Sequence, residues 1–319
     1  MDYLLSDFMG TPTWMWLTFI SVVLALLAAD LGLFHKSAKE IEVAESLRIS
    51  AVYIALGVSF SAFVGYQMGA PAATAYLTAF VVEKSLSLDN VFVIALIFSS
   101  LAIPRALQHR VLFWGILGVI VLRGIMIGLG AALVAQYHWV LYVFAAFLII
   151  TGIKMLFAKD SHDPADNAVV RFLKARMRLT ETLDGEKFFT KKNGVTFATP
   201  LFLALIMVET ADLIFAVDSV PAVFAITADP FLVYTSNIFA ILGLRALYFA
   251  LSAILHRFAY LKYALAILLV FIGSKLFIAD LMGWDKFPAS LSLGVTFVIL
   301  ATGVAVSLWK TRGAPPAHP

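Results

Sequence analysis

The chain has 319 residues, of which 62% are hydrophobic and only 13% are charged, and its mean hydropathy is +0.95. Because soluble globular proteins carry roughly 45–50% apolar and about 25% charged residues, this composition excludes an ordinary soluble enzyme, a disordered chain and a coiled coil. The net charge of +3 is small, and the absence of cysteine excludes a disulfide framework and a thiolate metal site. The composition indicates a helical membrane protein that crosses the bilayer several times.

Nine apolar stretches are long enough for a helix to cross a hydrocarbon core about 30 Å thick. In chain order they are 13–34, 47–67, 74–99, 110–134, 139–158, 201–226, 231–253, 259–280 and 290–309. The first is flanked by Asp2 and Asp7 and exceeds a signal-peptide core in length, so we expect it to be retained. The sequence predicts an all-α fold in which residues 1–309 form one transmembrane domain, followed by a tail at 310–319.

Lysine and arginine are concentrated in every second connection between the predicted spans. They gather at 35–48, at 99–110, in the long loop 159–200, around Arg257 and Lys262 and in the tail, whereas the opposite connections contain Lys286 alone. The positive-inside rule therefore predicts an outside N-terminus and a cytoplasmic C-terminus. Within 159–200, Arg171, Lys174 and Arg178 share one helical face. This face either lies on anionic lipid or serves only to orient the chain.

Spans three to five (74–158) resemble spans six to eight (201–280). The shared features are two acids followed by a small polar residue, a mid-span leucine–arginine pair and a glycine-x-lysine pattern. Since the third span enters from outside and the sixth from inside, the two halves would be inverted copies. Inverted repeats are typical of secondary transporters that bind substrate near mid-bilayer, although a duplicated bundle need not transport. The matched residues are Glu83, Asp89 and Asn90 with Asp212, Asp218 and Ser219; Arg123 with Arg245; and Gly152 with Gly273.

Acidic side chains within the spans are the main candidates for a site. Each costs about 2.5–3.5 kcal/mol at a helix centre on insertion scales. The central bases Lys84, Arg123 and Arg245 compensate only part of this negative charge. A divalent cation or protonation would balance the rest, and the two together predict a cation/proton exchanger. The acids are Asp30, Glu83, Asp89, Glu209, Asp212 and Asp218.

These acids, with Asn90 and Ser219, would form an all-oxygen metal site. Oxygen ligands suit Mg²⁺, Ca²⁺ or Mn²⁺. Residues six apart face about 120° from each other on a helix, so a site shared by both acids of a span requires an interrupted helix, for which Pro221 supplies a cause. The alternative is a structural clamp, in which Glu209 and Asp212 pair with Arg123 or Arg245. Lys84 and both arginines are expected to be counter-charges that compete with the ion.

Several strings resemble signatures of the TerC integral membrane protein family. They are 83–93 (EKSLSLDNVFV), 209–221 (ETADLIFAVDSVP), 234–249 (YTSNIFAILGLRALYF) and 29–32 (ADLG), and the resemblance extends from about residue 20 to 285. The nine-span form is similar to the Alx branch. The resemblance implies a bacterial inner-membrane exporter of Mn²⁺ within the lysine-exporter-like superfamily, with no permanent cofactor. Mn²⁺ comes from the resemblance alone, since the residues indicate only a hard divalent cation.

Other functions remain open at this stage. Family members are linked to tellurite resistance, to calcium, or to supplying metal to exported proteins, so a non-transporting scaffold that docks partners through 159–200 is one alternative. An intramembrane aspartyl protease is another, but no Gly-x-Gly-Asp string precedes Asp89 or Asp218, and the neighbouring bases disfavour a shared proton. We therefore expect no enzymatic activity and no nucleic-acid partner. Divalent ions, protons and lipid are the expected partners, and the sequence does not decide whether the chain forms a homo-oligomer.

Overall fold

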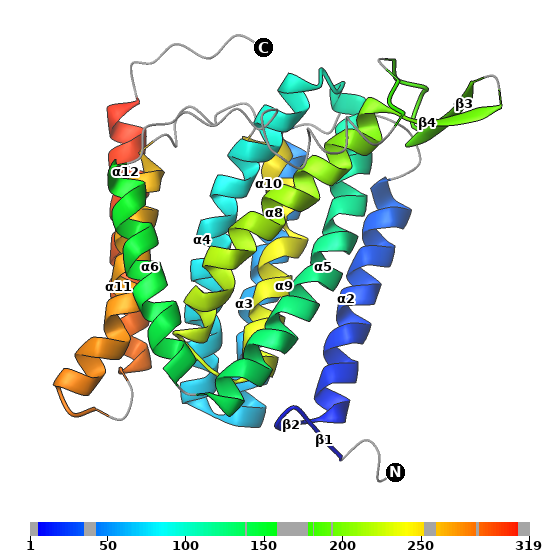
Figure 1. Cartoon of the computed structure of the whole chain (residues 1–319). Helices are drawn as coiled ribbons and strands as arrows, with labels where there is room; N and C mark the ends of the chain where they lie inside the picture. The colour runs from blue at the N-terminus through cyan, green and yellow to red at the C-terminus, as the bar shows by residue number, and fades with distance from the viewer. Residues whose placement is uncertain are drawn as a thin grey trace.

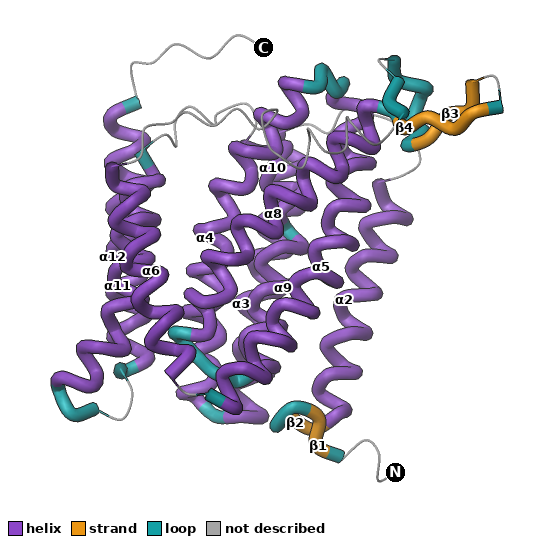
Figure 2. The backbone as a smooth tube through the Cα atoms, viewed as in Figure 1, coloured by secondary structure: helices purple, strands orange, loops and turns teal. Residues whose placement is uncertain are grey.

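The computed structural model describes residues 6–34, 43–137, 139–157, 178–180, 182–192, 194–251, 260–284 and 287–311. Long helices dominate this part of the chain, in agreement with the predicted all-α fold, and they run side by side with moderate tilts (Figures 1 and 2). The helices are α2 (Thr13–Phe34), α3 (Val43–Met68), α4 (Ala70–Ser100), α5 (Arg105–Gln136), α6 (Trp139–Phe157), α8 (Pro200–Phe224), α9 (Pro230–Leu242), α10 (Leu244–Leu251), α11 (Leu261–Leu281) and α12 (Ala289–Lys310).

Seven helical segments of the described chain are long and apolar enough to cross a membrane, and Thr13–Ala29 in α2 is a shorter apolar helix. Helix α4 is longer than most of these, at 31 residues, but carries Glu83, Lys84 and Asp89. Each predicted span coincides with one helix, except that the seventh corresponds to α9 and α10 with Gly243 between them. A multi-pass membrane protein is confirmed, whereas the count of nine spans, the repeat and the orientation remain predictions.

Proline and aspartate explain where several helices begin. Pro104 and Pro288 directly precede α5 and α12, while Pro200 and Pro230 are the first residues of α8 and α9. Proline suits such positions because its missing N–H is not needed in the first turn. Asp229 caps α9, since its carboxylate accepts hydrogen bonds from the amides of residues 231 and 232 at 2.9 and 3.2 Å.

The helix interruption lies elsewhere than expected. Pro221 does not end α8, which continues to Phe224. The proline lies in the last turn, so its missing N–H removes only one hydrogen bond near the helix end. The break instead falls at Gly243, between α9 and α10. Together these two helices form the central segment of the bundle, with 89% of its apolar window buried.

Helices α6 and α11 pack against each other through two glycines. A Cβ atom at Gly152 would lie 2.6 Å from the carbonyl oxygen of Ala266, and one at Gly273 would lie 2.5 Å from that of Ala145. Each glycine thus meets the residue seven positions before the other glycine. If the two halves are inverted copies, their third helices, α6 and α11, should make matching contacts of this kind. Only glycine allows the two backbones to approach so closely.

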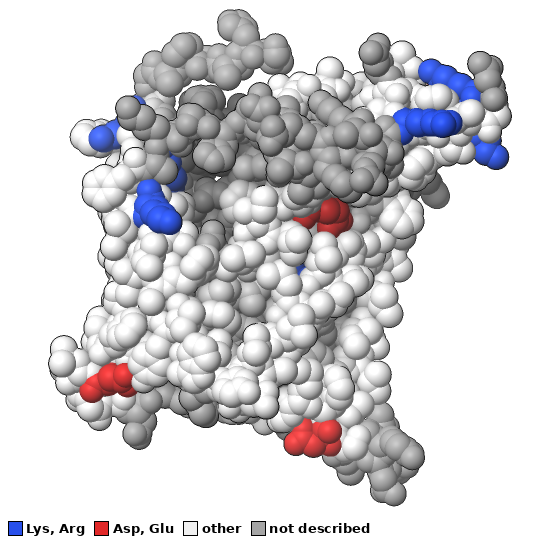
Figure 3. All heavy atoms as spheres, viewed as in Figure 1, with Lys and Arg blue, Asp and Glu red and all other residues white. Residues whose placement is uncertain are grey.

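A hairpin that the sequence did not predict lies within the segment 159–200. Strands β3 (Phe189–Lys192) and β4 (Val195–Ala198) pair antiparallel and project beyond the start of α8, whereas β1 (Asp7–Phe8) and β2 (Thr11–Pro12) precede α2. The predicted basic helix around Arg171 and Lys174 lies outside the described residues. On the face shown in Figure 3, most visible lysine and arginine side chains lie toward the end that carries β3 and β4. Helix α2 begins at the opposite end from that where α12 ends (Figure 1).

Candidate functional site

Four helices bring a buried charged cluster together in the middle of the bundle. Glu83 comes from α4, Arg123 from α5, Asp212 from α8 and Asn237 from α9. Arg123 and Glu83 are each 1% exposed, Asp212 is 6% exposed and Asn237 is fully buried. Isolated charges at such depth are very unfavourable, so each must find a partner.

Arg123 is the centre of this cluster. Its Nε and Nη2 donate to the two oxygens of Asp212, both at 3.2 Å, in a bidentate pair. Its Nη1 donates to Glu83 Oε1, to Ser219 Oγ at 3.1 Å and to Asn237 Oδ1. The planar guanidinium suits this fork geometry and cannot lose its charge. One positive group therefore holds two carboxyl groups, and when both are ionised the three side chains carry one surplus negative charge.

The two carboxylates are also bound across the pair α4 and α8. Asn90 of α4 donates to Asp212 Oδ1 at 3.0 Å, and Ser219 of α8 donates to Glu83 Oε1 at 3.4 Å. Asn90 follows Glu83 by seven positions, and Ser219 follows Asp212 by seven. Each helix thus supplies an acid and a polar group that serves the acid of the other. Two helices at equivalent positions in inverted copies should exchange hydrogen bonds in this way, as α6 and α11 exchange glycine contacts.

A cavity of about 50 Å³ lies beside the cluster, with Glu83, Ser87, Asn90, Arg123 and Ser219 among its lining residues. A buried water needs only about 10–15 Å³, so the cavity has room for an ion or a few waters. Glu83 Oε2 and Asn90 Oδ1 are buried without a hydrogen-bond partner. Unsatisfied buried oxygens are costly. With the hydroxyl groups of Ser87 and Ser219, these oxygens are of the type that a hard divalent cation binds, while the rest of the lining apart from Arg123 is apolar.

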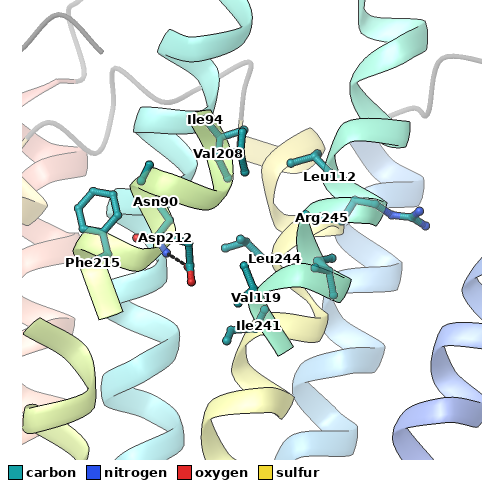
Figure 4. A pocket seen from close by; sticks show the side chains of 13 residues that line it. Asn90, Ile94, Leu112, Val119, Val208, Asp212, Phe215, Ile241, Leu244 and Arg245 are labelled. Carbon is teal, nitrogen blue, oxygen red and sulfur yellow. Dashed lines mark hydrogen bonds between the residues drawn. The ribbon is translucent and has the colours of Figure 1, made fainter. Parts of the chain in front are cut away.

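A smaller cavity of about 20 Å³ is lined by both Asn90 and Asp212, which are hydrogen-bonded to each other. Figure 4 shows this cavity, with the bond drawn as a dashed line and mostly apolar side chains around it. Arg245 contributes to the lining, but its guanidinium points away from Asp212 (Figure 4). It extends toward α3, where it also lines a space with Ser46 and Tyr53. Asn90 lines both the smaller cavity and the larger one beside Glu83.

Glu209 lies one helical turn from Asp212 but points to a different neighbour. Its carboxylate fills the space that a side chain at Gly118 of α5 would occupy, and it also approaches Gly115. Glu209 Oε2 is buried without a hydrogen-bond partner, and among the described residues Glu209 forms no ion pair. The clamp alternative thus describes Asp212, which pairs with Arg123, but not Glu209.

Lys84 lies next to the break in the central segment. Its ammonium donates to the carbonyl oxygen of Ala240, in the last turn of α9, at 2.9 Å. A cation is favourable at a helix C-terminus because the carbonyl dipoles point toward it. A Cβ at Gly243 would lie 2.9 Å from this ammonium and 3.0 Å from Tyr53. A larger residue at 243 would therefore collide with Lys84 and with α3.

The structure brings together five of the predicted site residues and leaves others apart. Glu83, Asp212, Asn90, Ser219 and Arg123 meet, whereas Glu209, Lys84 and Arg245 have separate surroundings. Among the described residues no group of three acids or histidines is arranged to hold a metal. The side chains of Asp30, Asp89 and Asp218 lie outside the described part of the structure.

The sequence reasoning missed Asn237. It lies in α9 and accepts a hydrogen bond from Arg123, while its Nδ2 is buried without a partner. The signal that could have found it was a lone amide within an apolar span, because polar side chains at such depth usually bind something.

Comparisons with known proteins agree with this picture of a membrane protein. The sequence profile described as "Integral membrane protein TerC family" matches residues 68–314. The chain is 46% identical over 307 residues, 96% of its length and 95% of the relative's, to "Uncharacterized membrane protein STKORF319" of Myxococcus xanthus. It is 47% identical over 310 residues, 94% of its length and 95% of the relative's, to "Putative membrane-bound redox modulator Alx" of Salmonella typhi. No solved structure matches the chain.

Proposed function

The chain belongs to the TerC integral membrane protein family, and from that membership we propose that it is a secondary transporter that exports a hard divalent cation in exchange for protons. Its bacterial relatives are membrane proteins, and the bacterial inner membrane is its location. We propose Mn²⁺ as the exported ion because of the family resemblance, while the residues themselves support any hard divalent cation.

One observation carries the proposal. Glu83 and Asn90 from α4, with Ser219 from α8, line a cavity of about 50 Å³, and the buried oxygens Glu83 Oε2 and Asn90 Oδ1 have no hydrogen-bond partner. A site of carboxylate, amide and hydroxyl oxygens favours Mn²⁺, Ca²⁺ or Mg²⁺ over softer ions. The cavity lies between antiparallel helices that exchange hydrogen bonds, which is where an inverted-repeat transporter binds its substrate.

Ion flux into proteoliposomes tests the proposal. Vesicles with the purified protein are given Mn²⁺, Ca²⁺ or Mg²⁺ with and without an imposed pH gradient. We expect Mn²⁺ movement that the proton gradient accelerates, and its loss in Asp89→Asn and in Asp218→Asn. Asp280→Asn is the matched control, since Asp280 on α11 accepts a hydrogen bond from Tyr142 at 2.7 Å, away from the cluster. The proposal fails if no divalent ion moves faster than in protein-free vesicles.

The hairpin favours one second candidate, a scaffold that docks another protein. Strands β3 and β4 project from the helical bundle and carry the exposed residues Phe189, Lys191 and Lys192 (Figure 1). Replacing 189–198 by a short glycine–serine linker separates the two functions. A transporter keeps its flux in vesicles, whereas a scaffold loses its cellular phenotype without any change in flux.

The name of the Salmonella relative refers to redox modulation. This chain contains no cysteine, so its own residues cannot perform thiol–disulfide exchange. An effect of this chain on redox state would therefore be indirect, for example through the supply of a metal ion.

A further inference from the structure

The environment of the Arg123 Nη1 atom resembles a cation site. It donates to three oxygens of different chemistry, from Glu83, Ser219 and Asn237, and the same guanidinium holds both oxygens of Asp212. Carboxylate, hydroxyl and amide oxygens around one positive centre are also the ligands that a hard metal ion selects. Here the positive centre is part of the protein.

We infer that Arg123 is a tethered counter-cation, which occupies the metal position in the unloaded transporter and is displaced when a divalent cation binds. This inference rests on the proposed function and adds a role for one side chain. A bare pair of buried carboxylates would be very unfavourable in the membrane interior. The guanidinium reduces that penalty whenever no metal is bound.

The adjoining cavity gives the displaced group and the incoming ion somewhere to lie. Arg123 itself lines this cavity of about 50 Å³, together with Glu83 and Asn90, each of which has one buried oxygen without a hydrogen-bond partner. An ion that binds there would use these free oxygens and would compete with Nη1 for Glu83. Because a divalent ion carries more charge than the guanidinium, it can replace the tethered group at the two carboxylates.

Arginine suits this role better than lysine because its charge is permanent. A guanidinium stays protonated at every physiological pH. Competition from Arg123 therefore does not change with the proton gradient, and any proton coupling must come from the carboxylates. A tethered competitor also lowers the affinity for the metal. A transporter needs such limited affinity in order to release its cargo.

A structural clamp would have the same contacts but the opposite effect on binding. If Arg123 only shapes the site, its removal disorders Glu83 and Asp212 and weakens metal binding. If it competes with the metal, its removal strengthens binding. The direction of the change in affinity therefore separates the two roles.

The experiment measures Mn²⁺ and Ca²⁺ affinity of the full-length protein in detergent by isothermal titration, for the wild type and for Arg123→Gln. We expect about 10- to 100-fold tighter binding in the variant, the value of one hydrogen bond to a charged group. Lys275→Gln is the control, because Lys275 is also a buried cation but donates to Ser292, away from the cluster, at 2.9 Å. The affinity of the Lys275→Gln variant for Mn²⁺ and Ca²⁺ should equal that of the wild type.

Arg123→Lys keeps the test decisive if Arg123→Gln is not recovered as folded protein. A single ammonium cannot reproduce the bidentate contact with Asp212, so we expect binding a few-fold tighter than in the wild type. Unchanged or weaker binding in the folded Arg123 variant overturns the inference, even if wild-type vesicles transport Mn²⁺. The converse result is that wild-type vesicles show no ion flux while the Arg123 variant binds metal more tightly than the wild type. That result would reject the proposed transport and would support the role of Arg123 as a competing cation.

Discussion

Arg123 and Arg245 hold equivalent positions in the two predicted halves, yet their surroundings differ. Arg123 is directed into the bundle and holds Glu83 and Asp212. Arg245 lines the smaller cavity but points away from Asp212, toward α3 (Figure 4). Among the described residues, the two arginines thus belong to different surroundings, and the buried ion pairs to Glu83 and Asp212 are made by Arg123.

Two differences between the halves are visible in the described residues. Lys84 follows Glu83, whereas the equivalent residue after Asp212 is Leu213. Lys84 binds the carbonyl of Ala240 beside Gly243, where the central segment breaks, while α5 runs unbroken past Arg123.

The largest expected effect comes from breaking the charge balance around Arg123. Arg123→Gln leaves two buried carboxylates without a cation and should cost about 3–5 kcal/mol of stability. Asp212→Asn removes the surplus negative charge and leaves Arg123 paired with Glu83, so this variant should lose less stability than Arg123→Gln. The midpoint of thermal unfolding in detergent, measured without divalent ions, checks the order. A lower midpoint for Asp212→Asn would contradict this reading of the cluster.

The sequence predicted the helices and most members of the cluster, but not their pairing. Apolar length indicates where each helix lies, and proline marks the start of several, which explains the agreement for α2 to α6 to within a few residues. Which acid meets Arg123 depends instead on how α4, α5, α8 and α9 cross, and no local pattern encodes that. Glu209 illustrates the limit. It lies three positions from Asp212, yet its carboxylate packs against Gly118 rather than an arginine.

Substitutions at the contact between α6 and α11 test whether the two halves are alike at an uncharged position. Gly152→Ala and Gly273→Ala each place a Cβ against a backbone carbonyl and should each cost about 1–3 kcal/mol. Since the contacts are reciprocal, we expect the two losses to be equal. Gly294→Ala on α12 is the control, because its Cβ would meet nothing within 4 Å. Clearly unequal losses in unfolding midpoint would argue against the twofold relation.

A smaller effect should appear where the halves differ in helix capping. Asp229 caps α9 through the amides of residues 231 and 232, whereas α5 begins after Pro104 without a side-chain cap. Asp229→Ala should therefore cost about 0.5–2 kcal/mol, and Asp229→Asn should retain most of the stability. Thermal unfolding of both variants provides the measurement. Equal destabilisation by alanine and asparagine would mean that the carboxylate charge, and not the cap, is what matters.

The smallest change in stability, with a clear change in transport, is expected at Gly118. Gly118→Ala pushes against the carboxylate of Glu209, but that group is the flexible end of a side chain and can move. Gly128→Ala on the same helix meets nothing within 4 Å, and both variants gain up to about 1 kcal/mol of helix propensity. The pair therefore isolates the position of Glu209. We expect slower Mn²⁺ flux in Gly118→Ala alone, because its displaced carboxylate lies one turn from Asp212. Equal flux in the two variants would remove Glu209 from the transport pathway and leave the Arg123 cluster to act without it.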